Sequence, residues 1–391
     1  MKKTIYLDNS ATTKISDEAL AEYVRVSREV WGNPSSLHSL GAEAERIISA
    51  SKQTILYTIG AKDAEIVFTA SGSEANNLAI IGRAHAKERY KKGAKIITAL
   101  GEHASVTEPL ASLEKEGVRV VSVPTSGGVL DLARLEEELT SDVILLSIMM
   151  VNNESGAVYN IPAAARMLRA KCPNALLHVD ATQGYLKIPF TKSGIGADMI
   201  TVSSHKIEGP KGVGALVIDK NVIKTRGISP VIFGGGQELG LRSGTENVPG
   251  IAAFATAARI GHENLRGNIE KLERLRSMLI EKISTTRELS EISMTLPESH
   301  APHILNITLP GIKSETMLHF LSSLGIFVSS GSACSSNGAH VSSALVAYGR
   351  SPEEADTSVR ISFGNENTEQ DVTALCEALA EGLKKLSRMK R

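Results

Sequence analysis

The chain has 391 residues, of which 42% are hydrophobic and 22% are charged, values typical of a globular protein with a sizeable core. Lysine and arginine together number 43, as do aspartate and glutamate, and this zero net charge argues against a nucleic-acid-binding protein or one held on anionic membranes. Only 4% of the residues are aromatic, which argues against stacking platforms for single strands, and no apolar run approaches the ~20 residues of a membrane span.

Residues 65–218 alternate between short apolar strands and amphipathic helices. The predicted strands are 65–70, 95–100, 118–123, 143–151, 175–179, 197–202 and 214–218. The predicted helices are 73–92, begun by Ser73, 105–116, 131–139, capped by Asp131, and 162–170, with Pro162 in its first turn. This pattern indicates an α/β fold with a mostly parallel central sheet and helices on both of its faces.

The pattern changes after Gly250. Residues 251–283 are predicted to be helical with a bend near Gly261 and Gly267. A smaller α+β unit is expected from about residue 292, with strands at 304–309 and 358–362, helices at 314–324 and 369–387, and a glycine- and serine-rich loop at 329–338. We therefore predict a large domain at residues 15–260, and a small domain made of residues 1–14 and 261–391.

Polar side chains follow the strands of the predicted sheet. Ser73, His103, Asn153, Asp180 and Lys206 lie in segments that come directly after apolar strands. Because ligands bind parallel sheets beyond the carboxyl ends of the strands, we expect these residues to converge on one site in the large domain.

Lys206 and Asp180 suggest a particular cofactor. A lysine amine can bond to the aldehyde of pyridoxal 5′-phosphate, and a carboxylate can pair with the cofactor's protonated pyridine nitrogen. Gln183 is placed to hydrogen-bond the ring's phenolate oxygen, while Ser203 and His205, which shortly precede the lysine, suit the phosphate. An aspartate at a strand end also caps turns. Because Lys206 supplies the partner chemistry, the sequence favours an enzyme with a bound cofactor.

The segment 71–77 (SGSEANN) follows a strand and opens a helix. Free backbone N–H groups make such a corner an anion site, in which Gly72 lets the backbone approach and Ser73 donates its hydroxyl. The alternative is that Ser73 is a plain helix cap.

Two further segments allow two interpretations each. Arg360 is a lone cation on an apolar strand, where it could bind a substrate carboxylate bidentately or form a structural salt bridge. The glycine-rich segment 234–247 could reach a phosphate or carboxylate, or end in a helix cap formed by Ser243 or Thr245.

The three cysteines, Cys172, Cys334 and Cys376, neither form a disulfide framework nor have metal-ligand spacing, so no metal is expected and a reducing cytoplasm fits best. Cys334 lies in a loop of small polar residues. A thiol in such a loop is expected to be exposed and mobile, so that it can act as a nucleophile. Cys172, at a helix end, and Cys376, in the closing helix, are predicted to be inert. The basic N-terminus lacks the apolar stretch of a secretory signal.

Together these motifs resemble the cysteine desulfurases of the NifS/IscS type, in the class V aminotransferase group of fold-type I pyridoxal phosphate enzymes. The resemblance extends over nearly the full length and is carried by residues 6–13 (YLDNSATT), 32–38 (GNPSSLH), 151–154 (VNNE), 178–183 (HVDATQ), 204–206 (SHK), 242–245 (RSGT) and 330–334 (SGSAC). The long loop around Cys334 is similar to that of members whose cysteine loop is mobile.

The resemblance implies a role for each predicted site residue toward the cofactor. Lys206 bonds to the cofactor aldehyde, His103 stacks on the ring and moves protons, and Asp180 binds the pyridine nitrogen. Gln183 and Asn153 contact the ring hydroxyl and the substrate region. The phosphate is bound by residues of both subunits of a homodimer, namely Gly72, Ser73, Ser203, His205 and the partner-derived Thr245.

The resemblance also implies the reaction. Arg360 binds the carboxylate of L-cysteine, and Cys334 attacks the substrate sulfur, becoming a persulfide and leaving L-alanine. The sulfur then passes to an acceptor protein of iron–sulfur cluster assembly or tRNA thiolation. Alternatives are a selenocysteine lyase, a class V aminotransferase, or a sulfur-relay component that mainly docks a partner. The last alternative is suggested by Leu239, where an arginine is common, and by a short tail after the last helix.

Overall fold

The computed structural model describes residues 4–86, 93–330 and 341–388 of the chain. Its larger part is a seven-stranded sheet with the order β2-β8-β7-β6-β5-β3-β4. The strands of this sheet are β2 (Ala64–Thr69), β3 (Lys95–Ala99), β4 (Arg119–Val123), β5 (Val143–Met149), β6 (Leu176–Asp180), β7 (Met199–Ser203) and β8 (Gly214–Asp219). All neighbouring pairs are parallel except the two that involve β8, so the predicted mostly parallel sheet is confirmed.

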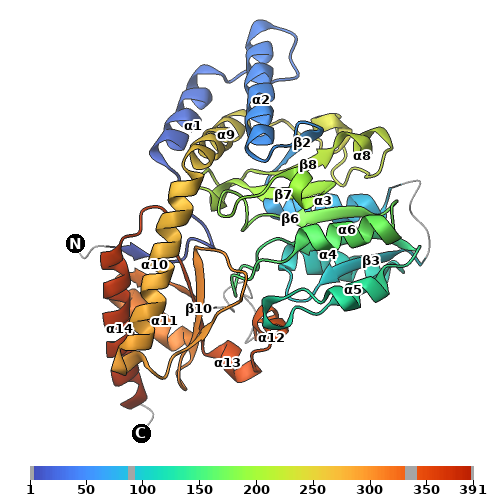
Figure 1. Cartoon of the computed structure of the whole chain (residues 1–391). Coiled ribbons are helices and arrows are strands. Elements are labelled where there is room, and N and C mark those ends of the chain that lie inside the picture. The colour runs from blue at the N-terminus through green and yellow to red at the C-terminus, as the bar shows by residue number, and fades with distance from the viewer. Residues whose placement is uncertain (1–3, 87–92, 331–340, 389–391) are drawn as a thin grey trace.

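Helices cover both faces of this sheet, as Figure 1 shows. Successive strand residues point to opposite faces, so Ile66 packs in one hydrophobic cluster and Val67 in another. The cluster around Val67 includes residues of α3 (Gly72–Ala84) and α4 (Ala104–Lys115). The cluster on the opposite face includes residues of α1 (Asp17–Glu29), α2 (Ser39–Thr58), α5 (Leu132–Glu138), α6 (Ile161–Lys171) and α9 (Val248–Glu263). Within it, α1 and α2 pack chiefly against α9. Two short helices also belong to this part: α7 (Lys192–Ile195) precedes β7, and α8 (Lys220–Lys224) follows β8.

A smaller α+β part follows. Its four-stranded antiparallel sheet has the order β12-β13-β10-β9, and a separate parallel pair joins β1 to β11. These strands are β1 (Ile5–Tyr6), β9 (Ser293–Thr295), β10 (Ile304–Thr308), β11 (Ile326–Phe327), β12 (Ser329–Ser330) and β13 (Ser358–Ser362). The helices are α10 (Leu265–Thr285), α11 (Ser314–Ser323), α12 (Ser343–Tyr348), α13 (Pro352–Asp356) and α14 (Glu369–Arg388).

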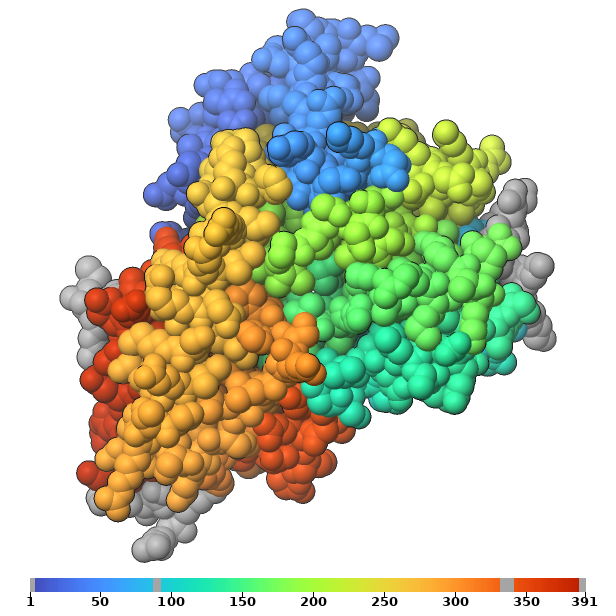
Figure 2. Space-filling view, viewed as in Figure 1, coloured from blue at the N-terminus to red at the C-terminus, as the bar shows by residue number. Residues whose placement is uncertain are grey.

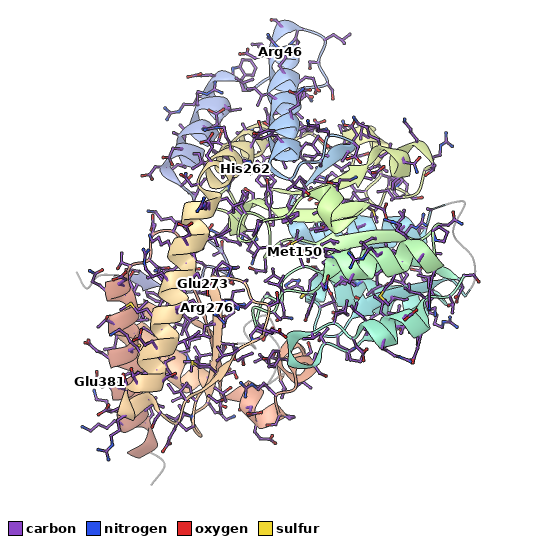
Figure 3. All side chains as sticks on the ribbon, in the orientation of Figure 1. Arg46, Met150, His262, Glu273, Arg276 and Glu381 are labelled. Atoms are coloured by element: carbon purple, nitrogen blue, oxygen red, sulfur yellow. The ribbon has the colours of Figure 1, made fainter. Side chains whose placement is uncertain are left out.

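The consecutive helices α9 and α10 link the two parts. In Figure 2 their gold side chains form a continuous band from the N-terminal helices to the C-terminal part. Figure 3 labels His262 near the end of α9, where its ring meets Tyr57 of α2 edge-on with centroids 5.4 Å apart. Arg276 on α10 is buried and donates from Nε to the Ile304 carbonyl oxygen (3.2 Å), which ties α10 to β10.

The N-terminal strand belongs structurally with the end of the chain. Leu7 packs in the hydrophobic cluster formed by residues 272–379, and β1 pairs with β11 of the smaller part. The proposed division into residues 15–260 and 1–14 with 261–391 stays a prediction.

Two predicted helix starts are wrong. Ser71, not Ser73, caps α3: its extended backbone lets Oγ accept from the Glu74 N–H (3.2 Å), which places Ser73 inside the first turn. Asn247, not Ser243 or Thr245, caps α9 by accepting from the Gly250 N–H (3.1 Å). The predicted bend near Gly261 occurs as the break between α9 and α10 at Asn264.

Several elements were not predicted from the sequence, namely α1 and α2 and the short segments β1, β9, β11, β12, α7, α8, α12 and α13. Of the predicted loop 329–338, residues 329–330 form β12, and the rest lies outside the described residues. Within the described ranges no helix is both long enough and apolar enough to cross a membrane.

Candidate active site

The carboxyl ends of β2, β3, β5, β6 and β7 open into one cavity of about 380 Å³. Residues of the N-terminal segment and of β12 and β13 complete its wall. Most of the predicted site residues line it, namely Gly72, Ser73, His103, Asn153, Asp180, Gln183, Ser203, His205, Lys206 and Arg360. The convergence expected at the sheet edge is therefore observed.

Two predicted site residues are not in this wall. Thr245 is exposed on the loop before α9 and does not line the cavity. Cys334 lies outside the described residues. The structure of the single chain thus leaves the predicted roles of both residues as proposals.

Asp180, the last residue of β6, is held in place by hydrogen bonds to both of its oxygens. Oδ1 accepts from the Thr182 N–H (2.9 Å) and Oδ2 accepts from Asn76 Nδ2 (2.8 Å). Asn76 is itself buried on α3. These two hydrogen bonds fix the orientation of the Asp180 carboxylate at the cavity wall.

Lys206 ends the turn of residues 204–206 that follows β7. Its Nζ donates to the carbonyl oxygens of Ser10 (2.6 Å) and Ala11 (2.8 Å), so the N-terminal segment holds the amine at the cavity wall. Gln183 is anchored to the same segment, because its Nε2 also donates to the Ser10 oxygen (2.9 Å). Met150, labelled in Figure 3, is buried beside Gly184, where an added Cβ would lie 2.6 Å from the Met150 sulfur.

A corner suited to a phosphate lies at the start of α3. A Cβ on Gly72 would come within 3.2 Å of Thr182 Oγ1 and 3.3 Å of Ser203 Cβ, so a side chain there would fill this corner. Ser203 Oγ is buried and has no hydrogen-bond partner among the described residues. An unpaired buried hydroxyl beside the N–H groups of a helix start fits an anionic ligand.

His205 borders the same wall. Its Nδ1 lies 3.1 Å from Thr12 Oγ1. Burial, together with the positive charges of Lys206 and Lys211, lowers the pKa of His205 to about 4. The imidazole is therefore neutral at pH 7 and can contribute a hydrogen bond to a phosphate without adding a charge.

His103 caps α4, with Nδ1 accepting from the Ser105 N–H (3.1 Å) and lying 2.8 Å from Ser105 Oγ. Burial lowers the pKa of His103; the Asp180 charge opposes this effect and the Lys206 charge adds to it. The ring at the cavity is thus favoured in its neutral form.

Both interpretations of Arg360 remain compatible with the structure. The predicted salt bridge exists: one guanidinium nitrogen lies 2.8 Å from Asp8 Oδ1, and another donates to the Asn153 oxygen (2.9 Å). Arg360 also lines the cavity, and its Nε is buried without a hydrogen-bond partner among the described residues. Its binding of a substrate carboxylate is a proposal.

The described residues before Cys334 line the same cavity, and those after it contact its wall. Ser329 and Ser330 line the wall, and Ser342 donates to Glu154 Oε2 (2.5 Å), a carboxylate that lines it too. By contrast, Cys172 and Cys376 are buried. Burial raises the pKa of the Cys172 thiol, and raises that of Cys376 to about 11, so both are poor nucleophiles, as predicted.

Sequence reasoning missed several residues of the site. Asn76, Ser105, Thr182, Asp8 and Glu154 all line the cavity. Helical spacing would have identified Asn76, because it lies four residues after Gly72 and therefore on the same face of α3. No local signal identifies Asp8, which meets Arg360 across 352 residues of sequence.

Glu102, beside His103, leads to a prediction about pH. Its Oε1 accepts from the Met149 N–H (2.7 Å), Oε2 has no partner among the described residues, and burial raises the pKa of this carboxyl well above its usual value. Because the pKa is higher in the folded than in the unfolded state, the protonated carboxyl stabilises the folded protein in full at pH values below the unfolded-state pKa. This stabilisation is lost as the pH rises through the folded-state pKa. Glu102→Gln removes this dependence, so its melting temperature relative to wild type should increase from pH 5 to pH 8.

Thermal unfolding of both proteins at the two pH values measures the effect, which amounts to about 1.4 kcal/mol per unit of pKa difference. The control is Glu114→Gln, an exposed glutamate on α4, for which the difference should not change with pH. A difference for Glu102→Gln that is independent of pH would show that the folded protein holds Glu102 ionised.

Comparisons with known proteins agree with this site. The family model described as Aminotransferase class-V matches residues 5–375. The relative "Cysteine desulfurase IscS 1" of Archaeoglobus fulgidus is 36% identical over 98% of each chain, and the "NifS/IcsS protein homolog" of Lactobacillus delbrueckii subsp. bulgaricus is 41% identical over 96% of each. A solved structure described as a NifS-like protein superposes with a TM-score of 0.90 at 35% identity, covering 98% of this chain and 100% of that one.

A further structure, described as SspA in complex with cysteine, has a TM-score of 0.78 at 30% identity and covers 92% of this chain and 99% of its own. The chain belongs to the class V aminotransferase family. Within that family it is one of the cysteine desulfurases of the NifS/IscS type, which are enzymes dependent on pyridoxal 5′-phosphate.

Proposed function

We propose that this enzyme removes sulfur from L-cysteine, leaving L-alanine, and that Cys334 receives the sulfur as a persulfide and passes it to an acceptor protein. The observation that carries this proposal is the cavity lined by Lys206, Asp180 and the described residues that precede the Cys334 segment. Ser342, which follows that segment, hydrogen-bonds Glu154 of the same wall. Three residues separate Cys334 from Ser330, a residue of the cavity wall. The cysteine named in relatives' and neighbours' descriptions supports the same substrate.

The residues of the cavity fit pyridoxal 5′-phosphate. Asp180 would hold the pyridine nitrogen, Lys206 the aldehyde carbon, and Gly72, Ser73, Ser203 and His205 the phosphate. His103 would stack on the ring, with Gln183 and Asn153 near its hydroxyl. When bound, the cofactor withdraws electrons from the α-carbon of an amino acid, which makes the neighbouring C–S bond breakable.

The protein groups then perform the sulfur transfer. Arg360 would orient the substrate carboxylate through its unpaired Nε. The Cys334 thiolate would attack the substrate sulfur: an S–S bond forms, the C–S bond breaks, and its electron pair remains with the carbon fragment. That fragment leaves as L-alanine after it is protonated.

Mass spectrometry tests this function. One equivalent of ³⁴S-labelled L-cysteine, added without reductant, should yield L-alanine and place the label on the peptide that contains Cys334. Label on Cys172 or Cys376, or L-alanine formed with all label released as sulfide, would contradict the proposed route. Capture of mixed disulfides with Cys334 then identifies the acceptor, in iron–sulfur cluster assembly or tRNA thiolation.

A homodimer, acting in the cytoplasm, is part of this proposal. Thr245 is exposed in a segment that also exposes Phe233 (80%) and Leu239 (53%), and exposed apolar side chains favour association. A second copy that covers this segment would bring Thr245 to the partner's phosphate site. Sedimentation equilibrium should therefore give twice the chain mass of 41.6 kDa, and a monomer at working concentration would contradict it.

A further inference from the structure

Asn76 is a buried side chain that links the carboxylate and the imidazole of the site. Its Nδ2 donates to Asp180 Oδ2 (2.8 Å) and to Ser105 Oγ (2.8 Å). Ser105 Oγ in turn lies 2.8 Å from His103 Nδ1. Asp180, Asn76, Ser105 and His103 therefore form one hydrogen-bonded series across β6, α3 and α4.

The direction of every hydrogen bond in this series follows from donor chemistry. A carboxylate only accepts, so the amide nitrogen of Asn76 faces Asp180, and its second proton goes to Ser105 Oγ. Ser105 Oγ thus accepts from Asn76 and keeps its own proton to donate to His103 Nδ1. The Ser105 backbone N–H, which can only donate, points at the same nitrogen (3.1 Å).

Two donors at Nδ1 leave no room for a proton on it. A neutral imidazole must then carry its proton on Nε2, and an imidazolium would place an N–H against the backbone N–H of Ser105. The burial of His103 and the nearby Lys206 charge favour the same neutral state, against the Asp180 charge.

We propose that Asn76 is a positioning residue of this enzyme: acting through Ser105, it holds His103 as the neutral Nε2–H tautomer and fixes that ring relative to Asp180. His103 therefore presents a hydrogen-bond donor at Nε2 in the resting enzyme. A proton accepted later must go to Nδ1, with displacement of the Ser105 donors. This inference rests on the proposed function only for the reaction in which His103 takes part.

Nitrogen NMR of the histidine rings in ¹⁵N-labelled holoenzyme tests the tautomer without any substrate. His103, assigned by its absence in His103→Gln, should show an unprotonated Nδ1 and a protonated Nε2. Asn76→Ala should lower the ratio of the Nε2–H to the Nδ1–H tautomer by about five- to tenfold, the effect of one neutral hydrogen bond. Asn77→Ala, the adjacent asparagine on the same helix, should leave the ratio unchanged.

A second measurement and a second variant complete the test. Asn76→Ala should also weaken pyridoxal phosphate binding by about tenfold, because Asp180 loses one of its two donors. If Asn76→Ala does not fold, Ser105→Ala, which removes only the hydroxyl of the series, should lower the tautomer ratio instead. A proton on Nδ1 in the wild type, or the same ratio in Ser105→Ala as in Asn77→Ala, would overturn the proposal. Because no L-cysteine is present, these outcomes do not depend on whether the proposed reaction occurs.

Discussion

Cys334→Ala is expected to lose sulfur transfer while it keeps its cofactor. The residues proposed to hold pyridoxal phosphate lie on the sheet edge and include no part of the segment around Cys334, so the cofactor absorbance of the variant should match wild type. L-alanine formation should fall by roughly 10⁴-fold, since loss of a covalent nucleophile commonly costs that much or more. Absorbance and single-turnover L-alanine assays measure the two effects.

The matched control is Cys172→Ser. Cys172 is buried, and its Sγ donates to the Thr140 oxygen (3.1 Å), a bond that a serine can keep. This variant should form L-alanine at the wild-type rate. Wild-type L-alanine formation by Cys334→Ala, with labelled sulfur still bound to the protein, would show that another group accepts the sulfur.

Lys206→Ala is expected to abolish both covalent attachment of the cofactor and turnover. Lys206 and Asp180 line the same cavity. The carbonyl oxygens of Ser10 and Ala11 only accept hydrogen bonds from the lysine amine, so they leave the amine able to bond covalently to the cofactor. Borohydride reduction followed by peptide mapping should fix the cofactor to Lys206 in wild type and to no lysine in the variant. L-alanine formation should fall by about 10³-fold or more.

Lys211→Ala provides the control for this experiment. Lys211 is exposed in the same loop, five residues further on, and does not line the cavity. It should retain both the covalent cofactor and turnover. Cofactor fixed to a peptide other than the one with Lys206 in wild type would refute the assignment of the lysine.

Much of the site could be predicted from the sequence because strand ends are local features. Apolar stretches that end shortly before His103, Asp180 and Lys206 could be recognised in the sequence. Parallel strands bring their carboxyl ends to one edge of the sheet. Predictions failed where a choice between neighbouring residues depends on backbone geometry. Ser71 rather than Ser73 caps α3, and Asn247 rather than Thr245 caps α9, because only these side chains reach the free N–H groups.

The class of fold, the strand ends that carry chemistry and, from Lys206 and Asp180, the cofactor could all be predicted from the sequence, because each prediction depends on residue type and short-range periodicity. The hydrogen-bond partners of the site residues depend instead on how distant segments pack together. The contacts of Lys206 with Ser10, of Asp8 with Arg360, and of Asn76 with Asp180 join residues 104 to 352 positions apart. Which of these distant residues come into contact depends on how the sheets and helices pack, so no local sequence pattern predicts it.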